Sequence, residues 1–236
     1  MDRGQAGGGQ LRVIAHRGAS GSQYENSPAA FRAARELGAD AVELDIHASR
    51  DGTLVVHHDP AIPGLGTIAA HDWAAIARHR LPNGEPIPRL AEALEVLDGL
   101  YVFVEAKTLP PSSDDRLLQV LTHGPTPDRY AVHSFDHRII LRLGRLQPPF
   151  RRGLLSASYV LDPVGMLEAA GATTLWQDWQ LIDQDLVTTL HRRNLELLSW
   201  TANDEAEIER LARLGVDGIC GNYPDRIRRV IERVAA

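Results

Sequence analysis

Short apolar runs alternate with longer helical patterns along the whole sequence. Eight runs have the composition of β-strands, and each is followed by a stretch with helical spacing of its apolar residues. We expect the strands at residues 11–15, 41–46, 101–105, 130–134, 153–156, 173–176, 195–200 and 217–220 and the helices at 28–37, 90–97, 114–122, 136–146, 162–170, 183–193, 204–214 and 224–234. Alternation of this kind is typical of a parallel sheet, and eight units in this length predict a single (β/α)₈ TIM barrel.

The pattern is interrupted between the second and third strands. Residues 60–88 are irregular and rich in Pro and Gly, and a short extra strand at 54–57 precedes them. We therefore expect a short insertion at this point of the barrel. A doubly wound sheet is the alternative fold, but no Gly-x-Gly-x-x-Gly follows the first strand to support it. No linker divides residues 11–236, which we interpret as one domain after a disordered, Gly-rich tail at 1–10.

Composition narrows the functional classes. A chain of 236 residues with 44% apolar content can bury one large core, and its net charge of −6 comes from interspersed charges of both signs. The sequence has no basic stripe, which argues against nucleic acid as a partner. The single cysteine, Cys220, permits no internal disulfide and fits a reducing compartment. With no secretory pattern and no apolar run of membrane-spanning length, we expect a cytoplasmic protein without stable membrane insertion; the oligomeric state stays open.

Polar residues stand at the ends of several predicted strands. His16 and Arg17 end the first strand, Glu43 and Asp45 lie in the second, and Glu105 and Lys107 end the third. The sequence His57-His58-Asp59 ends the short extra strand, and Trp200 ends the seventh barrel strand. The carboxyl ends of barrel strands meet at one mouth, so these side chains are candidates for a shared site.

The acidic residues suggest a metal site. Glu43 and Asp45 are two apart in a strand, so they face the same way at roughly 6.5 Å spacing. Glu105, on the adjacent strand, adds a third carboxylate. Three carboxylates without cysteine suit a hard divalent ion such as Mg²⁺ or Ca²⁺. The alternative is a pair of acids on an exposed strand face, which the apolar neighbours of Glu43 disfavour.

Histidine and arginine provide candidates for proton transfer and phosphate binding. An imidazole suits acid–base catalysis near neutral pH, and a guanidinium suits contact with a phosphate. Gly18 would permit an unusual φ or a close backbone approach. The alternative for each motif is a turn with a purely structural role, and one residue of His57-His58 would then serve only in packing. His47 and His133 are interpreted as packing or rim residues.

Lys107 stands out because every other basic residue apart from histidine is arginine. A surface position would accept either cation, whereas a crowded position beside Glu105 favours the compact ammonium of lysine. Residues 105 and 107 share one strand face. Chance survival of a single lysine is the alternative.

A set of short motifs follows one another along the chain. In order they are Ala15-His16-Arg17-Gly18, Glu25-Asn26-Ser27-Pro28, Glu43-Leu44-Asp45, Asp51-Gly52, Val56-His57-His58-Asp59, Ile87-Pro88-Arg89-Leu90-Ala91-Glu92, Glu105-Ala106-Lys107, Ser134-Phe135, Trp200-Thr201-Ala202-Asn203, Gly215-Val216-Asp217-Gly218-Ile219 and Tyr223-Pro224-Asp225. Each motif is weak alone, but the ordered set over about residues 13–226 is highly specific, and it resembles the glycerophosphodiester phosphodiesterase family.

The resemblance implies a TIM barrel that cleaves glycerophosphodiesters to sn-glycerol 3-phosphate and an alcohol, as part of glycerophospholipid catabolism. It implies the following roles: Glu43, Asp45 and Glu105 as ligands of one divalent ion, His16 and His58 as the acid–base pair, and Arg17 and Lys107 as phosphate contacts. We expect Trp200 to form one wall of the glycerol site. Glu25, Asn26 and Asp59 are expected to orient the groups that act directly. For Asn26 the alternative is a helix cap.

The sequence departs from the family pattern at two places, and the first of them puts the substrate preference in doubt. Residues 60–66 lack the Arg/Thr-rich stretch that is common there, and Cys220-Gly221-Asn222 replaces a more usual Ile-Thr-Asp. Three alternatives therefore remain open. Lysophospholipase D-like or other phosphodiesterase action within the superfamily is one, a phosphoinositide lyase is another, and a catalytically silent barrel that only binds phosphate esters is the third.

Overall fold

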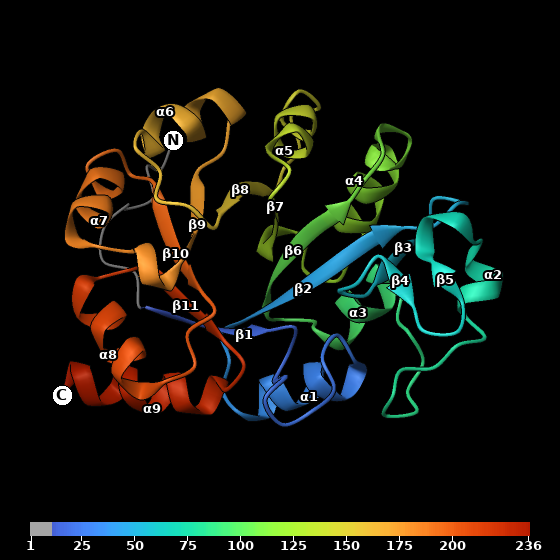
Figure 1. The fold of residues 1–236 in the computed structure, drawn as a ribbon, viewed down its shortest axis with the longest axis horizontal. Coiled ribbons are helices and arrows are strands. Elements are labelled where there is room, and N and C mark those ends of the chain that lie inside the picture. The colour runs from blue at the N-terminus through green and yellow to red at the C-terminus, as the bar shows by residue number, and fades with distance from the viewer. Residues whose placement is uncertain (1–10) are drawn as a thin grey trace.

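Eight parallel strands close into a barrel, with helices on its outside (Figure 1). The structure, a computed structural model, describes residues 11–236; the tail expected at 1–10 lies outside the described residues. Around the barrel the strands run β1, β11, β10, β9, β8, β7, β6 and β2, and β2 pairs with β1 to close the circle. The strands are β1 (Arg12–His16), β2 (Ala41–Ala48), β6 (Tyr101–Thr108), β7 (Tyr130–Ser134), β8 (Arg151–Ser156), β9 (Thr174–Asp178), β10 (Glu196–Trp200) and β11 (Gly218–Gly221). The predicted TIM barrel is confirmed.

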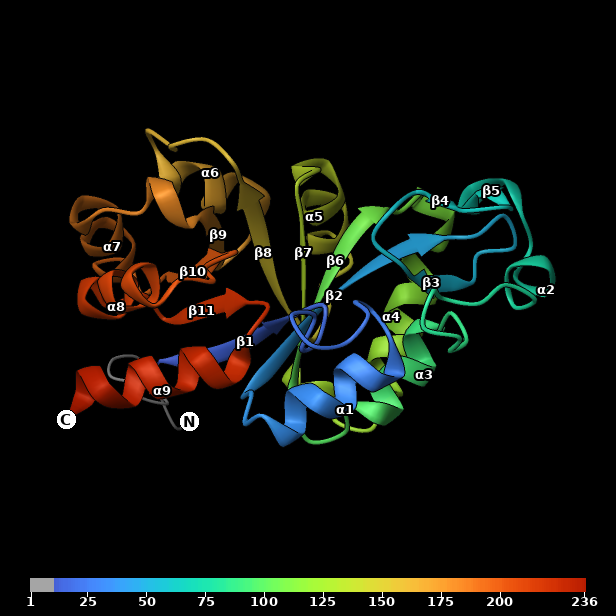
Figure 2. The ribbon, with the colours of Figure 1, turned by 60° about the horizontal axis from the view of Figure 1, so that its bottom comes forward.

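A helix follows each barrel strand, as Figure 2 shows from a second direction. The helices are α1 (Pro28–Glu36), α3 (Leu90–Val96), α4 (Asp114–Thr122), α5 (His137–Gly144), α6 (Pro163–Ala170), α7 (Gln184–His191), α8 (Glu205–Leu214) and α9 (Pro224–Ala235). Short 3₁₀ turns lie at Pro111–Ser113, Pro127–Arg129 and Trp179–Leu181. None of the helices within 11–236 combines the length and apolar character needed to cross a bilayer.

The predicted insertion between β2 and β6 is present and compact. It contains β3 (Leu54–Val56), β4 (Ala61–Ile62), β5 (Gly66–Thr67), a 3₁₀ turn (Ile68–Ala70) and α2 (Trp73–Ile76). It lies at the right of the barrel in Figure 1. β3 pairs antiparallel with the end of β2, and a small apolar cluster that includes Val55, Ile68 and Ile76 stabilises the insertion. This pairing places His57-His58-Asp59 beside the barrel mouth.

The loop between β1 and α1 is held in one conformation by its backbone. Gly18 has a φ of +80°, and a Cβ at this position would lie 2.6 Å from the carbonyl carbon of Ala30. The expectation of an unusual φ is therefore confirmed. Ser27 caps α1 by accepting a hydrogen bond from the Ala30 N–H at 3.1 Å, and Asn26 N–H donates to the Arg17 carbonyl at 3.0 Å. Together these contacts set the positions of Arg17 and Asn26.

Inside the barrel, apolar residues pack together, and polar residues of β2 and β6 follow them toward the carboxyl ends of the strands. Alternate residues of each strand point inward, and the inward apolar residues pack together as one cluster. This cluster comprises Ile14, Ala41, Phe103, Leu155, Trp176, Leu198 and Cys220. Glu43 and Asp45 have the same parity as Ala41, and Glu105 has the same parity as Phe103. They therefore continue the interior face toward the carboxyl ends of the strands. The outward residues of β2, such as Val42 and Leu44, belong to the larger core between strands and helices.

Candidate active site

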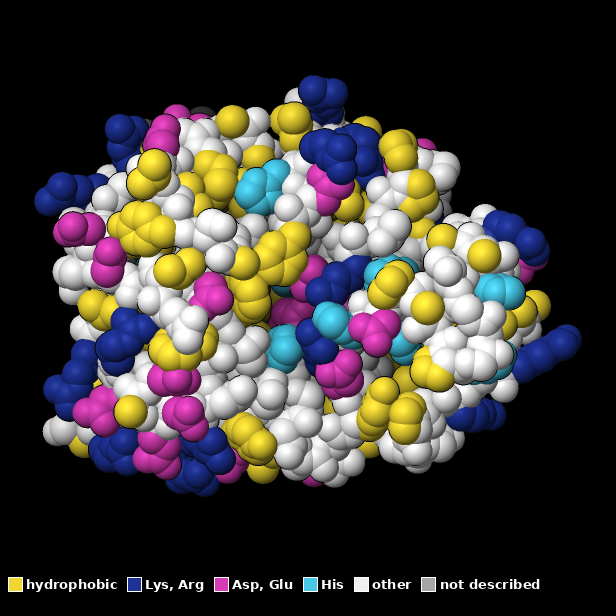
Figure 3. Space-filling view, viewed as in Figure 1, with side chains coloured by type: hydrophobic (Ala, Val, Ile, Leu, Met, Phe, Trp, Pro, Cys, Tyr) yellow, Lys and Arg dark blue, Asp and Glu magenta, His cyan; other side chains and the backbone are white. Residues whose placement is uncertain are grey.

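A cavity of about 170 Å³ opens at the carboxyl ends of the barrel strands. In Figure 3 this hollow is the place where histidine, acidic and basic side chains gather on the viewed face. Its lining residues are His16, Arg17, Glu43, His58, Glu105, Lys107, His133, Phe135, Leu155, Trp176, Trp200, Thr201 and Cys220. The strand ends that the sequence predicts to converge do meet at this mouth.

The three carboxylates lie together, but they are not equivalent. Asp45 is fully buried: its Oδ2 is 3.1 Å from Arg17 Nε and accepts a hydrogen bond from Asn26 Nδ2 at 2.8 Å. Its Oδ1 is 3.2 Å from Lys107 Nζ, which lies 2.8 Å from Glu105 Oε1. Arg17 and Lys107 thus face the acidic cluster from two sides. Glu43 lies deeper and accepts the backbone N–H of Arg17 at 3.2 Å.

The environment separates the pKa values of the carboxylates. Burial raises the pKa of Glu43 well above its usual value and that of Glu105 to about 7, and the neighbouring carboxylates add to both shifts. Burial alone would also raise the pKa of Asp45, but Arg17 and Lys107 outweigh it and hold that pKa below its usual value. Arg17 and Lys107 therefore compensate the charges of Glu43 and Glu105 only in part, and a divalent cation would supply the remaining positive charge.

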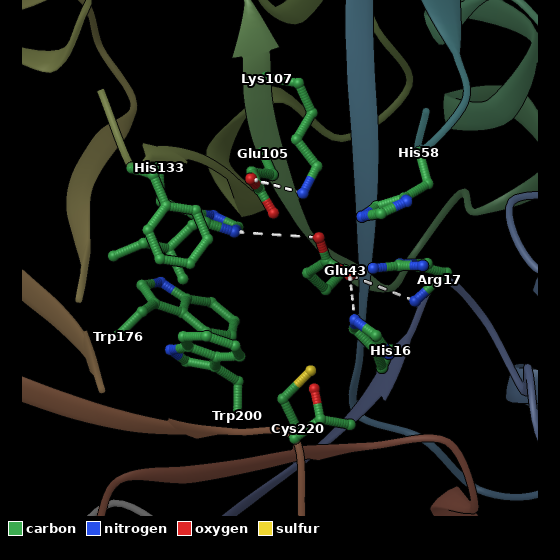
Figure 4. Close-up of a pocket in the computed structure, with 13 residues that line it drawn as sticks. His16, Arg17, Glu43, His58, Glu105, Lys107, His133, Trp176, Trp200 and Cys220 are labelled. Atoms are coloured by element: carbon green, nitrogen blue, oxygen red, sulfur yellow. Dashed lines mark hydrogen bonds and ion pairs between the residues drawn. The ribbon is translucent and has the colours of Figure 1, made fainter. Parts of the chain in front are cut away.

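The two candidate catalytic histidines are each held at Nδ1. His16 Nδ1 lies 2.8 Å from the side-chain oxygen of Asn222, and His58 Nδ1 lies 2.8 Å from Asp59 Oδ1. Burial lowers the pKa of His16 to about 4, and its Nε2 lies 4.0 Å from Glu43 Oε2. Figure 4 shows His16, Arg17 and His58 on one side of the cavity. With Nδ1 engaged, each ring has Nε2 available for proton transfer.

Asn222 and His133 are site residues whose roles sequence reasoning missed. Asn222 is one of the residues that depart from the family pattern, at the end of β11; barrel closure brings it against His16 of β1. His133, interpreted from sequence as a packing or rim residue, does pack: its ring stacks on Trp176 at 4.4 Å between centroids. It also lines the cavity, and its Nε2 lies 3.9 Å from Glu43 Oε1. The sequence does contain a signal for a site role of His133, since this residue lies in the predicted strand that follows the strand of Glu105.

The three residues expected to orient the acting groups each contact one candidate site residue. Glu25 accepts a hydrogen bond from Arg17 Nη1 at 2.8 Å, Asn26 contacts Asp45, and Asp59 contacts His58. Trp200 lines the cavity and meets Phe135 edge to face at 5.3 Å. His57 and His47 are not among the lining residues. His57 Nδ1 lies 2.9 Å from the Asp59 carbonyl oxygen, and His47 Nε2 lies 3.0 Å from that of His58.

Comparisons with known proteins connect this chain to one enzyme family. The sequence model described as the Glycerophosphoryl diester phosphodiesterase family matches residues 16–226. The chain is 30% identical to a glycerophosphodiester phosphodiesterase of Caldanaerobacter subterraneus subsp. tengcongensis, over 94% of this chain and 98% of the relative. It is 27% identical to the probable glycerophosphodiester phosphodiesterase 2 of Mycobacterium tuberculosis, over 95% of this chain and 91% of that relative.

A solved structure extends the similarity to three dimensions. An Oleispira antarctica phosphodiesterase, solved in complex with the product sn-glycerol-3-phosphate, superposes with a TM-score of 0.89 at 26% identity, covering 94% of this chain and 97% of that one. A glycerophosphodiester phosphodiesterase from Thermotoga maritima has a TM-score of 0.79 at 22% identity, covering 95% of this chain and 100% of that one. Because the identity is low, this similarity supports the fold alone.

Replacing Glu43 with glutamine should stabilise the metal-free protein at high pH. The folded-state pKa of Glu43 is raised above 4.5, so its contribution to stability is full below pH 4.5 and is lost as the pH rises through the folded value. Glutamine does not ionise, so it keeps its contribution to stability as the pH rises. We expect metal-free Glu43→Gln to melt above wild type at pH 8, with the difference shrinking toward pH 5.

Thermal melting in EDTA at both pH values measures this effect. The matched control is Glu92→Gln, which removes an exposed carboxylate paired with Arg89 and should not raise the melting temperature. A stabilisation by Glu43→Gln as large at pH 5 as at pH 8 would contradict the burial argument.

Proposed function

Because the chain belongs to the glycerophosphoryl diester phosphodiesterase family, and is thus a phosphoric diester hydrolase, we propose that it uses a divalent metal ion to hydrolyse glycerophosphodiesters. The products are sn-glycerol 3-phosphate and an alcohol. One observation carries this proposal: a single cavity holds a buried carboxylate cluster, two cations and two histidines held at Nδ1. We also propose a role in glycerophospholipid catabolism and a cytoplasmic location, the latter supported by a single, buried cysteine.

The chemistry of the carboxylate cluster fits a hard divalent ion. Glu43, Asp45 and Glu105 would hold it; the raised pKa values of Glu43 and Glu105 reflect the burial of charge without enough compensation. Oxygen ligands suit Mg²⁺ or Ca²⁺. When bound, such an ion would polarise the phosphoryl group and offset the negative charge that develops on it.

Arg17 and Lys107 are proposed to bind the phosphate. Both side chains line the cavity, and both already lie beside carboxylates that fix their positions. A guanidinium can give two parallel hydrogen bonds to phosphate oxygens, and an ammonium adds a compact charge. Trp200, with Phe135 at its edge, forms an apolar wall that would pack against the glycerol carbons.

The histidines are proposed to carry out the two proton transfers of the reaction. Hydrolysis adds a hydroxyl group to phosphorus and transfers one proton to the leaving alkoxide. One of His16 and His58 would take the proton from the nucleophile, and the other would give a proton to the leaving oxygen. Asn222 and Asp59 hold the rings at Nδ1, which leaves Nε2 of each ring for this transfer.

A panel of substrates tests the function directly. Glycerophosphocholine, glycerophosphoethanolamine and lysophosphatidylcholine would be incubated with the protein and Mg²⁺, Ca²⁺ or Mn²⁺. Release of sn-glycerol 3-phosphate would be measured for the first two substrates, and release of choline would be measured for the lysolipid. We expect turnover of the short glycerophosphodiesters with added ion and none after exhaustive chelation. Turnover of the lysolipid alone would favour a lysophospholipase D, and binding without turnover would indicate a silent barrel.

The histidine assignment predicts a contrast between neighbours. His58→Ala should lower kcat by about 10²–10⁴-fold, which is the usual contribution of a positioned acid or base, and His16→Ala should do the same. His57→Ala is the matched control and should cost much less, because His57 does not line the cavity. Steady-state kinetics with glycerophosphocholine would measure all three. A dispensable His58 beside an essential His57 would overturn the assignment.

Lys107 should not tolerate arginine. Its ammonium fits between Asp45 and Glu105, where a longer, forked side chain would be crowded. We expect Lys107→Arg to lower kcat at least about tenfold without lowering the melting temperature. Arg50→Lys is the reverse exchange at an exposed pair with Asp72 and should leave kinetics unchanged. Wild-type kinetics for Lys107→Arg would remove Lys107 from the phosphate site.

A further inference from the structure

Strand register places His133 at the level of the carboxylates. Asp45 of β2 pairs with Glu105 of β6, and Glu105 pairs with His133 of β7. Paired residues of parallel strands point to the same face of the sheet, so all three side chains point into the barrel. Glu43 lies two residues before Asp45 on the same face. In Figure 4 His133 faces Glu43 and Glu105 from the side opposite His16 and His58.

The distances allow one ion to contact Glu43, Glu105 and His133. Each residue offers a ligand atom, and the three atoms lie within 4.8 Å of one another. His133 Nε2 is 3.9 Å from Glu43 Oε1. Two ligands that are each about 2.1 Å from an ion lie at most about 4.2 Å apart, so the nitrogen and Glu43 already satisfy this limit. Even with all three separations at 4.8 Å, each ligand atom would need to move by only about 0.7 Å to reach a common ion.

His133 is also free to act as a ligand. The buried Nδ1 of His133 has no hydrogen-bond partner among residues 11–236. The ring is held by stacking on Trp176 instead. Histidine binds metals as the neutral imidazole, in which one ring nitrogen is protonated and the other offers its lone pair. Nδ1 would carry the proton and leave the lone pair of Nε2 facing the carboxylates.

We infer that His133 is a nitrogen ligand of the metal ion, joining Glu43 and Glu105 through Nε2. The inference rests on the proposed metal site and goes beyond its oxygen-only ligand set. An imidazole ligand strengthens binding of ions such as Co²⁺ and Zn²⁺ much more than binding of Mg²⁺ or Ca²⁺, which prefer oxygen. His133 would therefore move the preference of the site away from Mg²⁺ and Ca²⁺.

The first experiment uses the wild-type protein with Mn²⁺ alone. Pulsed electron paramagnetic resonance detects a nitrogen bound directly to Mn²⁺, and incorporation of ¹⁵N-histidine identifies that nitrogen as imidazole. We expect one coupled imidazole nitrogen in wild type, no coupling in His133→Phe, and unchanged coupling in His16→Phe. Phenylalanine retains the stacking on Trp176. Absence of coupling in wild type, or its loss in His16→Phe instead, would overturn the inference even if His133→Phe failed to fold.

Calorimetric titration tests the ion preference on the same variants. His133→Phe should bind Co²⁺ and Zn²⁺ at least about tenfold more weakly, while its affinity for Mg²⁺ should change less than about threefold. Unchanged affinities together with weaker binding of sn-glycerol 3-phosphate would make His133 a substrate contact and overturn the inference. The function is tested separately: nitrogen coupling without hydrolysis would contradict the proposed activity alone, and metal-dependent hydrolysis without coupling would contradict the ligand assignment alone.

Discussion

The structure depends on the burial of negative charge at one end of a narrow barrel. Three carboxylates point into the same interior, where water is largely excluded and like charges repel strongly. Arg17 and Lys107 outweigh the effect of burial on Asp45, whereas they compensate Glu43 and Glu105 only in part. This uneven compensation gives the site its character, because it creates a place for a cation and leaves two fixed cations at the rim for a phosphate.

The fold makes this arrangement possible by separating packing from chemistry. Along each strand the outward residues pack against helices, so the inward positions near the carboxyl end are free to be polar. Surrounding contacts then fix the polar groups. Asn26 holds Asp45, Glu25 holds Arg17, and the rings of His16 and His58 are each held at Nδ1. A site that is fixed in this way loses little entropy when the substrate binds.

Most of the fold could be predicted from the sequence because the strand–helix alternation is regular. The main differences are at element ends: β2 continues to Ala48 and β6 to Thr108, beyond the expected residues 46 and 105. The reason is tertiary, since the insertion strand β3 pairs with this part of β2. The local motifs also pointed to the residues that line the cavity. They could not reveal the neighbours of His16 or His133, because Asn222 is 206 residues from His16 in sequence, and the position of His133 depends on the register of β6 and β7.

Binding of a divalent ion to the metal-free protein tests the central claim most directly. Calorimetric titration with Mg²⁺ at pH 7, repeated in two buffers of different ionisation enthalpy, measures both the number of ions and the protons released. Because the pKa of Glu105 is about 7 and that of Glu43 is raised, we predict one bound ion accompanied by proton release that diminishes at pH 9. An absence of binding, or binding without proton release at pH 7, would contradict the account of an under-compensated carboxylate cluster.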